Sequence, residues 1–101
     1  MPLVNLTPHT INVMDIAIEP SGTIARCSEE TTFAGKFEDI KLVKRVYTDV
    51  VNLPEQKEGV MLIVSNLVRM ACPDRKDLAS PGDAIRKKDG YIIGVTNLIV
   101  N

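Results

Sequence analysis

Hydrophobic positions in the first quarter of the chain fall into short runs that polar and turn-forming residues separate. Residues 3–6 form an apolar run closed by Thr7-Pro8, and residues 11–14 and 23–27 alternate apolar with polar side chains. Short runs of this kind, bounded by Pro, Gly, Asn, Asp or Ser, are typical of β-strands. The pattern therefore predicts strands at 3–6, 11–14, 16–18 and 23–27.

The clearest strand is predicted over residues 40–51, where β-branched residues are frequent and apolar side chains alternate with charged ones. The preceding segment, residues 29–38, is polar and contains Gly35. This segment predicts a weak edge hairpin, in which residues 31–33 pair with Phe37 and the residues after it.

An unbroken apolar run at residues 60–64 predicts a strand that is buried on both faces. Ser65 follows this run as a candidate helix N-cap, and residues 65–72 predict a short helix that ends before Pro73. Residues 73–83 are mostly polar and include two prolines and a glycine, so they predict a loop.

Near the end of the chain, residues 84–87 and 91–95 flank Lys88-Asp89-Gly90, which predicts a hairpin, and residues 98–100 predict a last strand. These elements together predict an α+β fold. We expect a small, mainly antiparallel β-sheet with one short helix packed on it, in a single domain of residues 1–101.

Charge and length narrow the possible partners. The 101 residues carry a formal net charge of −1, from 12 Lys and Arg against 13 Asp and Glu. Because each phosphate contact of a duplex-DNA binder needs a cation, this balance disfavours nucleic acid as a partner.

No apolar run approaches the ~20 residues of a membrane helix, and the first 14 residues lack the pattern of a leader. With Cys27 and Cys72 interpreted as free thiols, we expect a soluble protein of the cytoplasm with no membrane partner.

Several segments spread over nearly the whole chain together form one pattern. They are Asn5-Leu6-Thr7-Pro8-His9, residues 20–26, Leu53-Pro54-Glu55, Ile63-Val64-Ser65, Pro73-Asp74-Arg75-Lys76-Asp77-Leu78 with Pro81-Gly82, and Asp89-Gly90 with Ile92-Ile93-Gly94. In these segments the chain resembles a group of small proteins found in phage and prophage genomes. The resemblance implies a phage setting, and hence the host cytoplasm, but it implies no biochemical activity. Small phage proteins often counter host defence, and one class, the sponges, binds nucleotide immune signals and withholds them. That link is an analogy of size and context.

Two segments could bind an anionic ligand through hydroxyl, amide or imidazole groups. His9 and the neighbouring Thr10 could donate to a phosphate, although Pro8 could equally shape a turn in which His9 only satisfies nearby carbonyls. Ser65 and Asn66 lie where the buried strand meets the helix, a place where free N–H groups can hold an anion. Alternatively, Ser65 is only a cap, which contributes roughly 1 kcal/mol to the helix.

Arginines supply the remaining candidates. Arg75 and Arg86 could clamp phosphate groups, since guanidinium groups bind phosphate in a bidentate manner. The alternative is that Arg75 forms a surface ion pair with Asp77 or Asp74, where such pairs contribute little. Arg26 completes the set of ligand-binding candidates, although an arginine on a sheet face is usually solvated.

Catalytic chemistry finds little support in the sequence. One histidine and two isolated cysteines do not supply a metal-binding set, and no nucleophile has a base beside it in a known pattern. We therefore predict no catalytic residue, no metal and no cofactor. Arg69, on the predicted helix, is expected to be exposed.

Three functions remain open. The leading prediction is a phage-type binding protein that sequesters a small anionic, nucleotide-derived immune signal without catalysis. We expect it to be a homo-oligomer, because a site on so short a chain is often shared between subunits. The first alternative is an inhibitor that docks on a host enzyme, for example by adding residues 31–37 to a sheet edge of that enzyme. The second alternative is a small hydrolase that uses His9.

Overall fold

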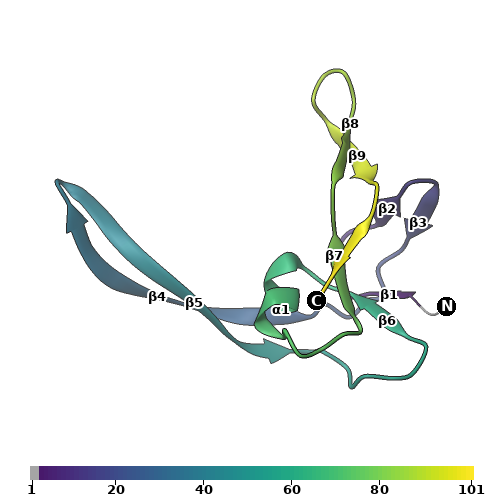
Figure 1. Ribbon diagram of the computed structural model, residues 1–101, viewed down its shortest axis with the longest axis horizontal. Coiled ribbons are helices and arrows are strands. Elements are labelled where there is room, and N and C mark those ends of the chain that lie inside the picture. The colour runs from purple at the N-terminus through teal and green to yellow at the C-terminus, as the bar shows by residue number, and fades with distance from the viewer. Residues whose placement is uncertain (1–2) are drawn as a thin grey trace.

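The strands form three separate sheets in the computed structural model of the protein, which describes residues 3–101 (Figure 1). In chain order the elements are β1 Leu3–Asn5, β2 Ile11–Val13, β3 Ile16–Ile18, β4 Arg26–Phe37, β5 Ile40–Val51, β6 Met61–Ile63, α1 Asn66–Ala71, β7 Leu78–Pro81, β8 Ala84–Arg86, β9 Ile92–Val95 and β10 Leu98–Val100. The first sheet has the order β1-β6-β7-β10, the second has the order β3-β2-β9-β8, and β4 pairs with β5.

Strand β6 lies in the middle of the first sheet, which confirms the buried strand predicted at 60–64. It pairs in parallel with β1 on one side and with β7 on the other. Leu62, Ile63 and Val64 are at most 3% exposed. The core cluster joins residues around this sheet to Val68 of α1 and comprises Leu6, Ala25, Leu62, Val64, Val68 and Leu78.

Helix α1 begins after Ser65, whose side-chain Oγ accepts a hydrogen bond of 3.3 Å from the backbone N–H of Val68. This geometry confirms Ser65 as the N-cap. The helix ends at Ala71, shortly before Pro73, and Val68 is its buried residue. Helix and sheet are therefore joined mainly by one apolar side chain and by the polar contacts of Arg69 described below.

The predicted loop over residues 73–83 is wrong in its second half, because Leu78–Pro81 forms β7. This strand lies between β6 and β10, and Leu78, Ala79 and Ser80 are fully buried. The sequence does not predict this strand, because Ser80 and the following proline are typical of loops. In the structure the Ser80 hydroxyl is hydrogen-bonded to Arg69 and Asn66, which offsets the cost of burying it.

The α+β prediction holds in broad terms, but the sheets are mixed rather than mainly antiparallel. The pairings β1–β6, β6–β7 and β2–β9 are parallel, and the other four are antiparallel. One of the parallel pairs, β6–β7, arises because β6, α1 and β7 form a β-α-β crossover, which places the two strands in the same direction. The sequence does not predict this crossover, because residues 78–81 have the composition of a loop.

The predicted hairpin near the end of the chain is confirmed by β8 and β9, which pair as antiparallel strands. Strand β9 also pairs in parallel with β2, at Val13 and Val95. Gly94 makes this close approach possible. A Cβ at position 94 would lie 2.8 Å from the backbone oxygen of Asn12.

Strands β4 and β5 form a long hairpin, which we call the arm. The prediction of a strand over 40–51 is confirmed at both ends by β5. The predicted turn near Gly35 is wrong, because β4 continues to Phe37 and the chain turns at Glu38 and Asp39. Gly35 instead lies at the end of a β-bulge, in which the chain has one extra residue between Phe33 and Gly35. The strand predicted at 23–27 contributes only its last two residues to β4.

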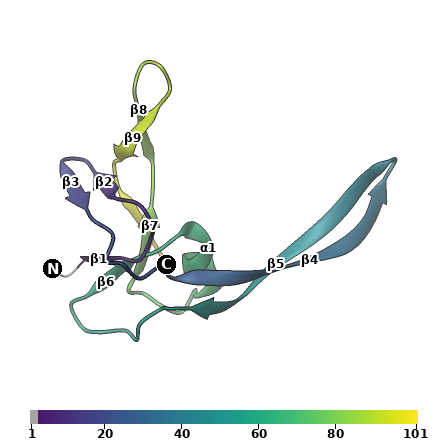
Figure 2. The ribbon, with the colours of Figure 1, turned by 180° about the vertical axis from the view of Figure 1, so that it is seen from behind.

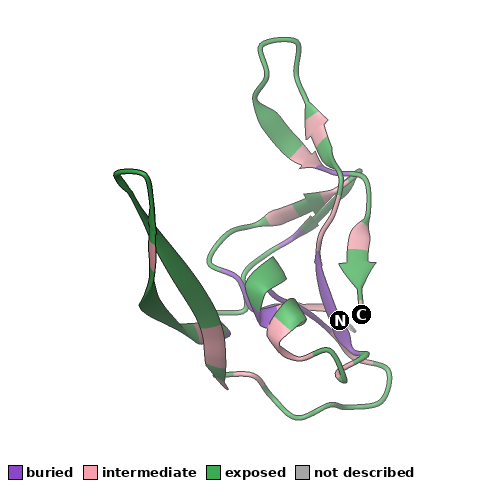
Figure 3. Ribbon diagram, turned by 60° about the vertical axis from the view of Figure 1, so that its left-hand side comes forward, coloured by how far each residue is buried: buried purple, intermediate pink, exposed green. Residues whose placement is uncertain are grey.

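The arm projects away from the rest of the molecule in both ribbon views (Figures 1 and 2). The chain measures 50 × 40 × 23 Å and has a radius of gyration of 16.3 Å. A compact domain of this length has a radius of gyration near ~13 Å. The buried residues cluster around β6 and α1, while nearly the whole arm is exposed (Figure 3).

Candidate functional site

The segment Asn5 to His9 is held together by the buried side chain of Asn5. Its Nδ2 donates to the backbone oxygens of His9 (2.8 Å) and Ile18 (2.9 Å), and its Oδ1 accepts from the backbone N–H (2.9 Å) and hydroxyl (2.6 Å) of Thr7. All hydrogen-bonding positions of the amide are thus used. These hydrogen bonds connect β1 to the loop before β2 and to the end of β3. Asn5 and Thr7, in the segment Asn5-Leu6-Thr7-Pro8-His9, therefore have a structural role.

The candidates His9 and Thr10 lie on the outside of that loop. Both are exposed, and the Thr10 hydroxyl donates to the carboxylate of Glu19 (2.9 Å). Within residues 3–101, the His9 imidazole makes no hydrogen bond. His9 is instead held by its backbone, since its carbonyl accepts from the side chains of Asn5 and Thr7.

Arg75 is occupied by an internal ion pair. Its Nε donates to Oδ1 of Asp77 and its Nη2 to Oδ2, both at 2.8 Å, and Nη2 also donates to the carbonyl of Pro54 at 2.9 Å. The hydrogen bonds from Arg75 hold the pKa of Asp77 below its usual value, and the same bonds raise the pKa of Arg75. The guanidinium thus joins the segment before β7 to the loop before β6.

Asn66 belongs to a polar network around Arg69, which is half-buried rather than exposed as predicted. Arg69 donates to Ser80 (2.8 Å), to Asn66 (2.6 Å) and to the side-chain oxygen of Asn101 (3.1 Å). The amide of Asn101 in turn donates to the carbonyls of Arg69, Cys72 and Arg75. This network fixes α1 on the first sheet and satisfies carbonyls at the end of the helix.

Arg86 lies at the end of β8, where its Nη1 donates to the carbonyl of Gly90 at 3.1 Å. This bond spans the turn of the β8–β9 hairpin. Arg75 and Arg86 are thus held at different parts of the fold, one beside Pro54 and the other on the projecting hairpin. They do not form a joint clamp.

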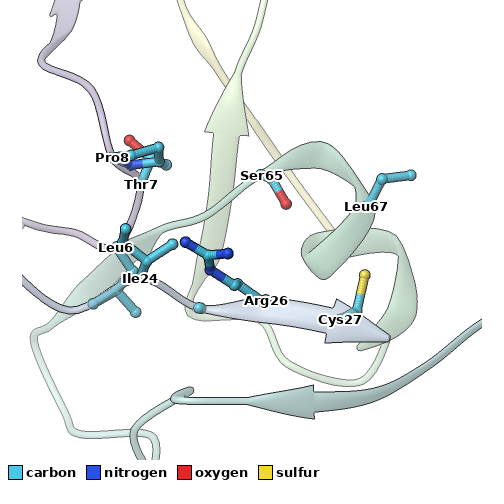
Figure 4. Close-up of a pocket in the computed structure, with 9 residues that line it drawn as sticks. Leu6, Thr7, Pro8, Ile24, Arg26, Cys27, Ser65 and Leu67 are labelled. Atoms are coloured by element: carbon cyan, nitrogen blue, oxygen red, sulfur yellow. The ribbon is translucent and has the colours of Figure 1, made fainter. Parts of the chain in front are cut away.

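Arg26 and Ser65 are the two candidates that the structure brings to one place. They line a shallow, open hollow of about 400 Å³ at the base of the arm, which we call the Arg26 hollow. Its side chains lie as Figure 4 shows, with the guanidinium of Arg26 directed into the space between Ser65 and Leu6. Within residues 3–101, Arg26 has no hydrogen bond or ion pair from its side chain. The complete lining is Leu6, Thr7, Pro8, Ile24, Ala25, Arg26, Cys27, Ser65 and Leu67.

The arm carries many of the large hydrophobic side chains that the structure leaves exposed. Opposite residues of the two strands share a face, so the register divides the arm into two faces. The inner face, on the side of Cys27 and the core, carries Phe33 and Val43. The outer face carries Phe37, Ile40, Leu42 and Val46. All six are between 41% and 67% exposed.

The two outer edges of the arm differ in charge. The edge formed by β5 carries Lys41, Lys44, Arg45 and Asp49, and is mainly basic. The edge formed by β4 carries Arg26, Glu29 and Glu30 in its first half and Lys36 near the tip, so its charges balance. Glu29 also forms an exposed ion pair of 3.4 Å with Arg45.

The sequence indicates the arginines as candidates and offers residues 31–37 for strand addition, but it does not predict that β4 and β5 pair along their whole length. A signal for the exposed apolar surface is present in β5, which has apolar side chains on both faces. Comparisons with protein-family models, with curated proteins and with solved structures find no match to this chain. Residues 3–101 contain no cluster of three or more potential metal ligands and no helix long and apolar enough to span a membrane.

Proposed function

We propose that this protein works without catalysis, by binding another protein chain, and that the β4 edge of the arm is the surface it uses. The observation that carries this proposal is the antiparallel pair of two twelve-residue strands that projects from the body with large apolar side chains exposed on both faces. A two-stranded hairpin is marginally stable in water without further packing. An added strand would supply backbone hydrogen bonds and cover the aromatic residues of β4.

The charge of the two edges supports β4 over β5 as the pairing edge. Lysines on an edge strand discourage other chains from pairing with it, and β5 carries two lysines and Arg45. Strand β4 instead has the uncharged run Thr31-Thr32-Phe33 in its middle. This run falls within the segment that the sequence marked for strand addition.

The phage setting implied by the resemblance makes a host enzyme in the cytoplasm the expected target. The protein would then be an inhibitor that blocks this enzyme by occupying one of its sheet edges. Such an enzyme would have to offer an open strand and a surface that accepts Phe33.

The test starts with capture of host proteins on the full-length chain, after which each captured protein is purified and its affinity remeasured. Phe33→Lys should weaken the affinity by about tenfold or more, because it removes an exposed aromatic and places a cation on the edge. Ile93→Lys makes the same change on the β8–β9 hairpin and should have little effect. Equal affinities for the wild type and Phe33→Lys would contradict the proposal.

Sequestration of a small anionic, nucleotide-derived signal is the second candidate, and the Arg26 hollow is the observation that favours it. Arg26 and Ser65 could donate to phosphate oxygens, while the apolar walls could accept a base. Calorimetry with a panel of linear and cyclic nucleotides tests this candidate. Binding should weaken with salt and fall at least about tenfold in Arg26→Ala, but not in Arg86→Ala. A panel that gives no heat with the wild type would contradict it.

A further inference from the structure

We propose that, in the protein alone, the β4 edge is occupied by β4 of a second copy, in an antiparallel pair whose two-fold axis passes through Thr32. The inference rests on the proposed function, because it names the chain that pairs with the same edge. This pairing would join two marginally stable hairpins into one four-stranded sheet with the order β5-β4-β4-β5.

The β-bulge in β4 determines which side chains share a face. Before the bulge, Glu29, Thr31 and Phe33 lie on the inner face, and Ser28, Glu30 and Thr32 on the outer face. The extra residue, Ala34, reverses the alternation, since Gly35 pairs with Leu42 of the outer face. Lys36 therefore lies on the inner face and Phe37 on the outer face.

With this alternation, a two-fold axis at Thr32 pairs residues of the same face throughout. With Ala34 left unpaired in this pairing as well, Glu29 faces Lys36 of the other copy on the inner face. The symmetry produces this opposite-charge pair twice. Thr32 faces its own counterpart on the axis, and Thr–Thr pairs are favourable between neighbouring strands.

The ends of the paired strands are complementary as well. The same register brings the tip residues Glu38 and Asp39 of one arm beside Cys27 and Arg26 of the other. Arg26 has no side-chain partner within residues 3–101, and neither do the two acids at the tip. The pairing therefore gives Arg26 an acidic partner at the base of each arm.

The β5 edge does not offer an equivalent arrangement. A two-fold pair of β5 strands places Lys41 opposite Arg45 when the axis passes through Val43, and Arg45 opposite its own counterpart when the axis passes through Arg45. Like charges on neighbouring strands are destabilising. The charge pattern thus selects β4.

The apolar side chains fit the same arrangement. Thr31 faces Phe33 of the other copy, so the two Phe33 rings lie close to the axis on the inner face, each near Val43 of its own arm. Phe33 is 64% exposed in the single chain and would be covered in part.

An edge pair covers less than the ~800 Å² per partner of a standard interface, so the dimer should dissociate on dilution. A target strand would compete with the second copy for the same edge.

The experiment measures the dimer dissociation constant of the full chain by sedimentation equilibrium. Thr32→Lys places two lysines face to face on the axis and should weaken the dimer about tenfold or more. Glu29→Lys and Lys36→Glu should each weaken it, and the double variant Glu29→Lys/Lys36→Glu should restore most of the loss, because the opposite-charge pairs return. Glu58→Lys and Lys88→Glu make the same charge changes away from the arm and should leave dimerisation unchanged.

Hydrogen exchange of the wild type provides a measurement that does not depend on variants. Amide exchange in residues 28–37 should slow as protein concentration rises, while exchange in the β8–β9 hairpin should not. A monomer at all concentrations, or a double variant weaker than both single ones, would overturn the inference. A monomer that still captures a host protein through Phe33 would leave the proposed function intact. A charge-swappable dimer that captures none would support the inference and contradict the proposed function.

Discussion

Arg75 and Asp77 face each other across one residue of the chain and form two parallel hydrogen bonds, Nε to Oδ1 and Nη2 to Oδ2, each of 2.8 Å. The carboxylate is almost completely buried, with 4% of its side chain exposed, while a quarter of the arginine side chain is exposed. The third bond of the guanidinium, to the Pro54 carbonyl, connects this pair to the end of the arm. The sequence offered this ion pair as one alternative for Arg75, and in the structure the pair connects two segments of the fold.

We expect Asp77→Asn to destabilise the protein by about 1–3 kcal/mol at pH 7, because the buried arginine bonds lose their charged acceptor. The pKa of Asp77 is lowered in the folded state, so its contribution is complete above the unfolded pKa of about 4 and is lost as the pH falls through the folded pKa. Urea unfolding between pH 2 and pH 7 measures this effect. The stability difference between wild type and variant should shrink on acidification, and a constant difference would contradict the assignment. Asp74→Asn, on an exposed residue, is the matched control.

Asn5→Ala should destabilise the protein by about 2–4 kcal/mol. It removes four hydrogen bonds of a buried amide and leaves the carbonyls of His9 and Ile18 without this donor. Asn12→Ala, in an exposed position of β2, should cost less than about 0.5 kcal/mol. Chemical denaturation of both variants checks the prediction. Similar losses in the two variants would show that Asn5 does not organise the loop.

Local signals account for the parts of the fold that the sequence predicted well. The apolar run before Ser65, the cap itself and the turn at Gly90 each depend on a few neighbouring residues. The register of parallel strands depends on residues far apart in the chain. The sequence does not predict β7, because a buried Ser80 has the same local sequence context as a serine in a loop. Its partners, Arg69 and Asn66, lie more than ten residues away.

The candidate site was harder to predict than the fold, since an arginine in a sequence does not show what it is bonded to. Arg69 was expected at the surface, yet it contacts Ser80, Asn66 and Asn101. The sequence does contain a signal for the structural role of Asn5. An Asn two residues before a Thr favours side-chain hydrogen bonds to the backbone around a turn.

Gly94→Ala should destabilise the protein by about 1–3 kcal/mol, because the added methyl group would lie 2.8 Å from the backbone oxygen of Asn12 and force β9 away from β2. Since the clash is with the backbone, Gly94→Ala should cost as much in an Asn12→Gly background, which lacks the Asn12 Cβ, as it does in the wild type. Thermal unfolding of the four proteins compares the two losses. A smaller loss in the Asn12→Gly background would place the clash on the Asn12 side chain, whose Cβ is 3.2 Å away.

Met14→Gly is expected to stabilise the protein, in contrast to most substitutions. Met14 has a φ of 51°, in the left-handed region that costs a non-glycine residue about 1–2 kcal/mol, and its side chain is 63% exposed. Glycine adopts this conformation without the steric cost, although it also gains freedom in the unfolded chain, so a net gain of about 0.5–1 kcal/mol follows. Ala17→Gly, on the neighbouring strand β3 and also exposed, has no positive φ to relieve and should lose about 0.5–1 kcal/mol. Urea unfolding of the two variants should therefore give shifts of opposite sign, and a loss in both would mean that the turn between β2 and β3 stores no strain at Met14.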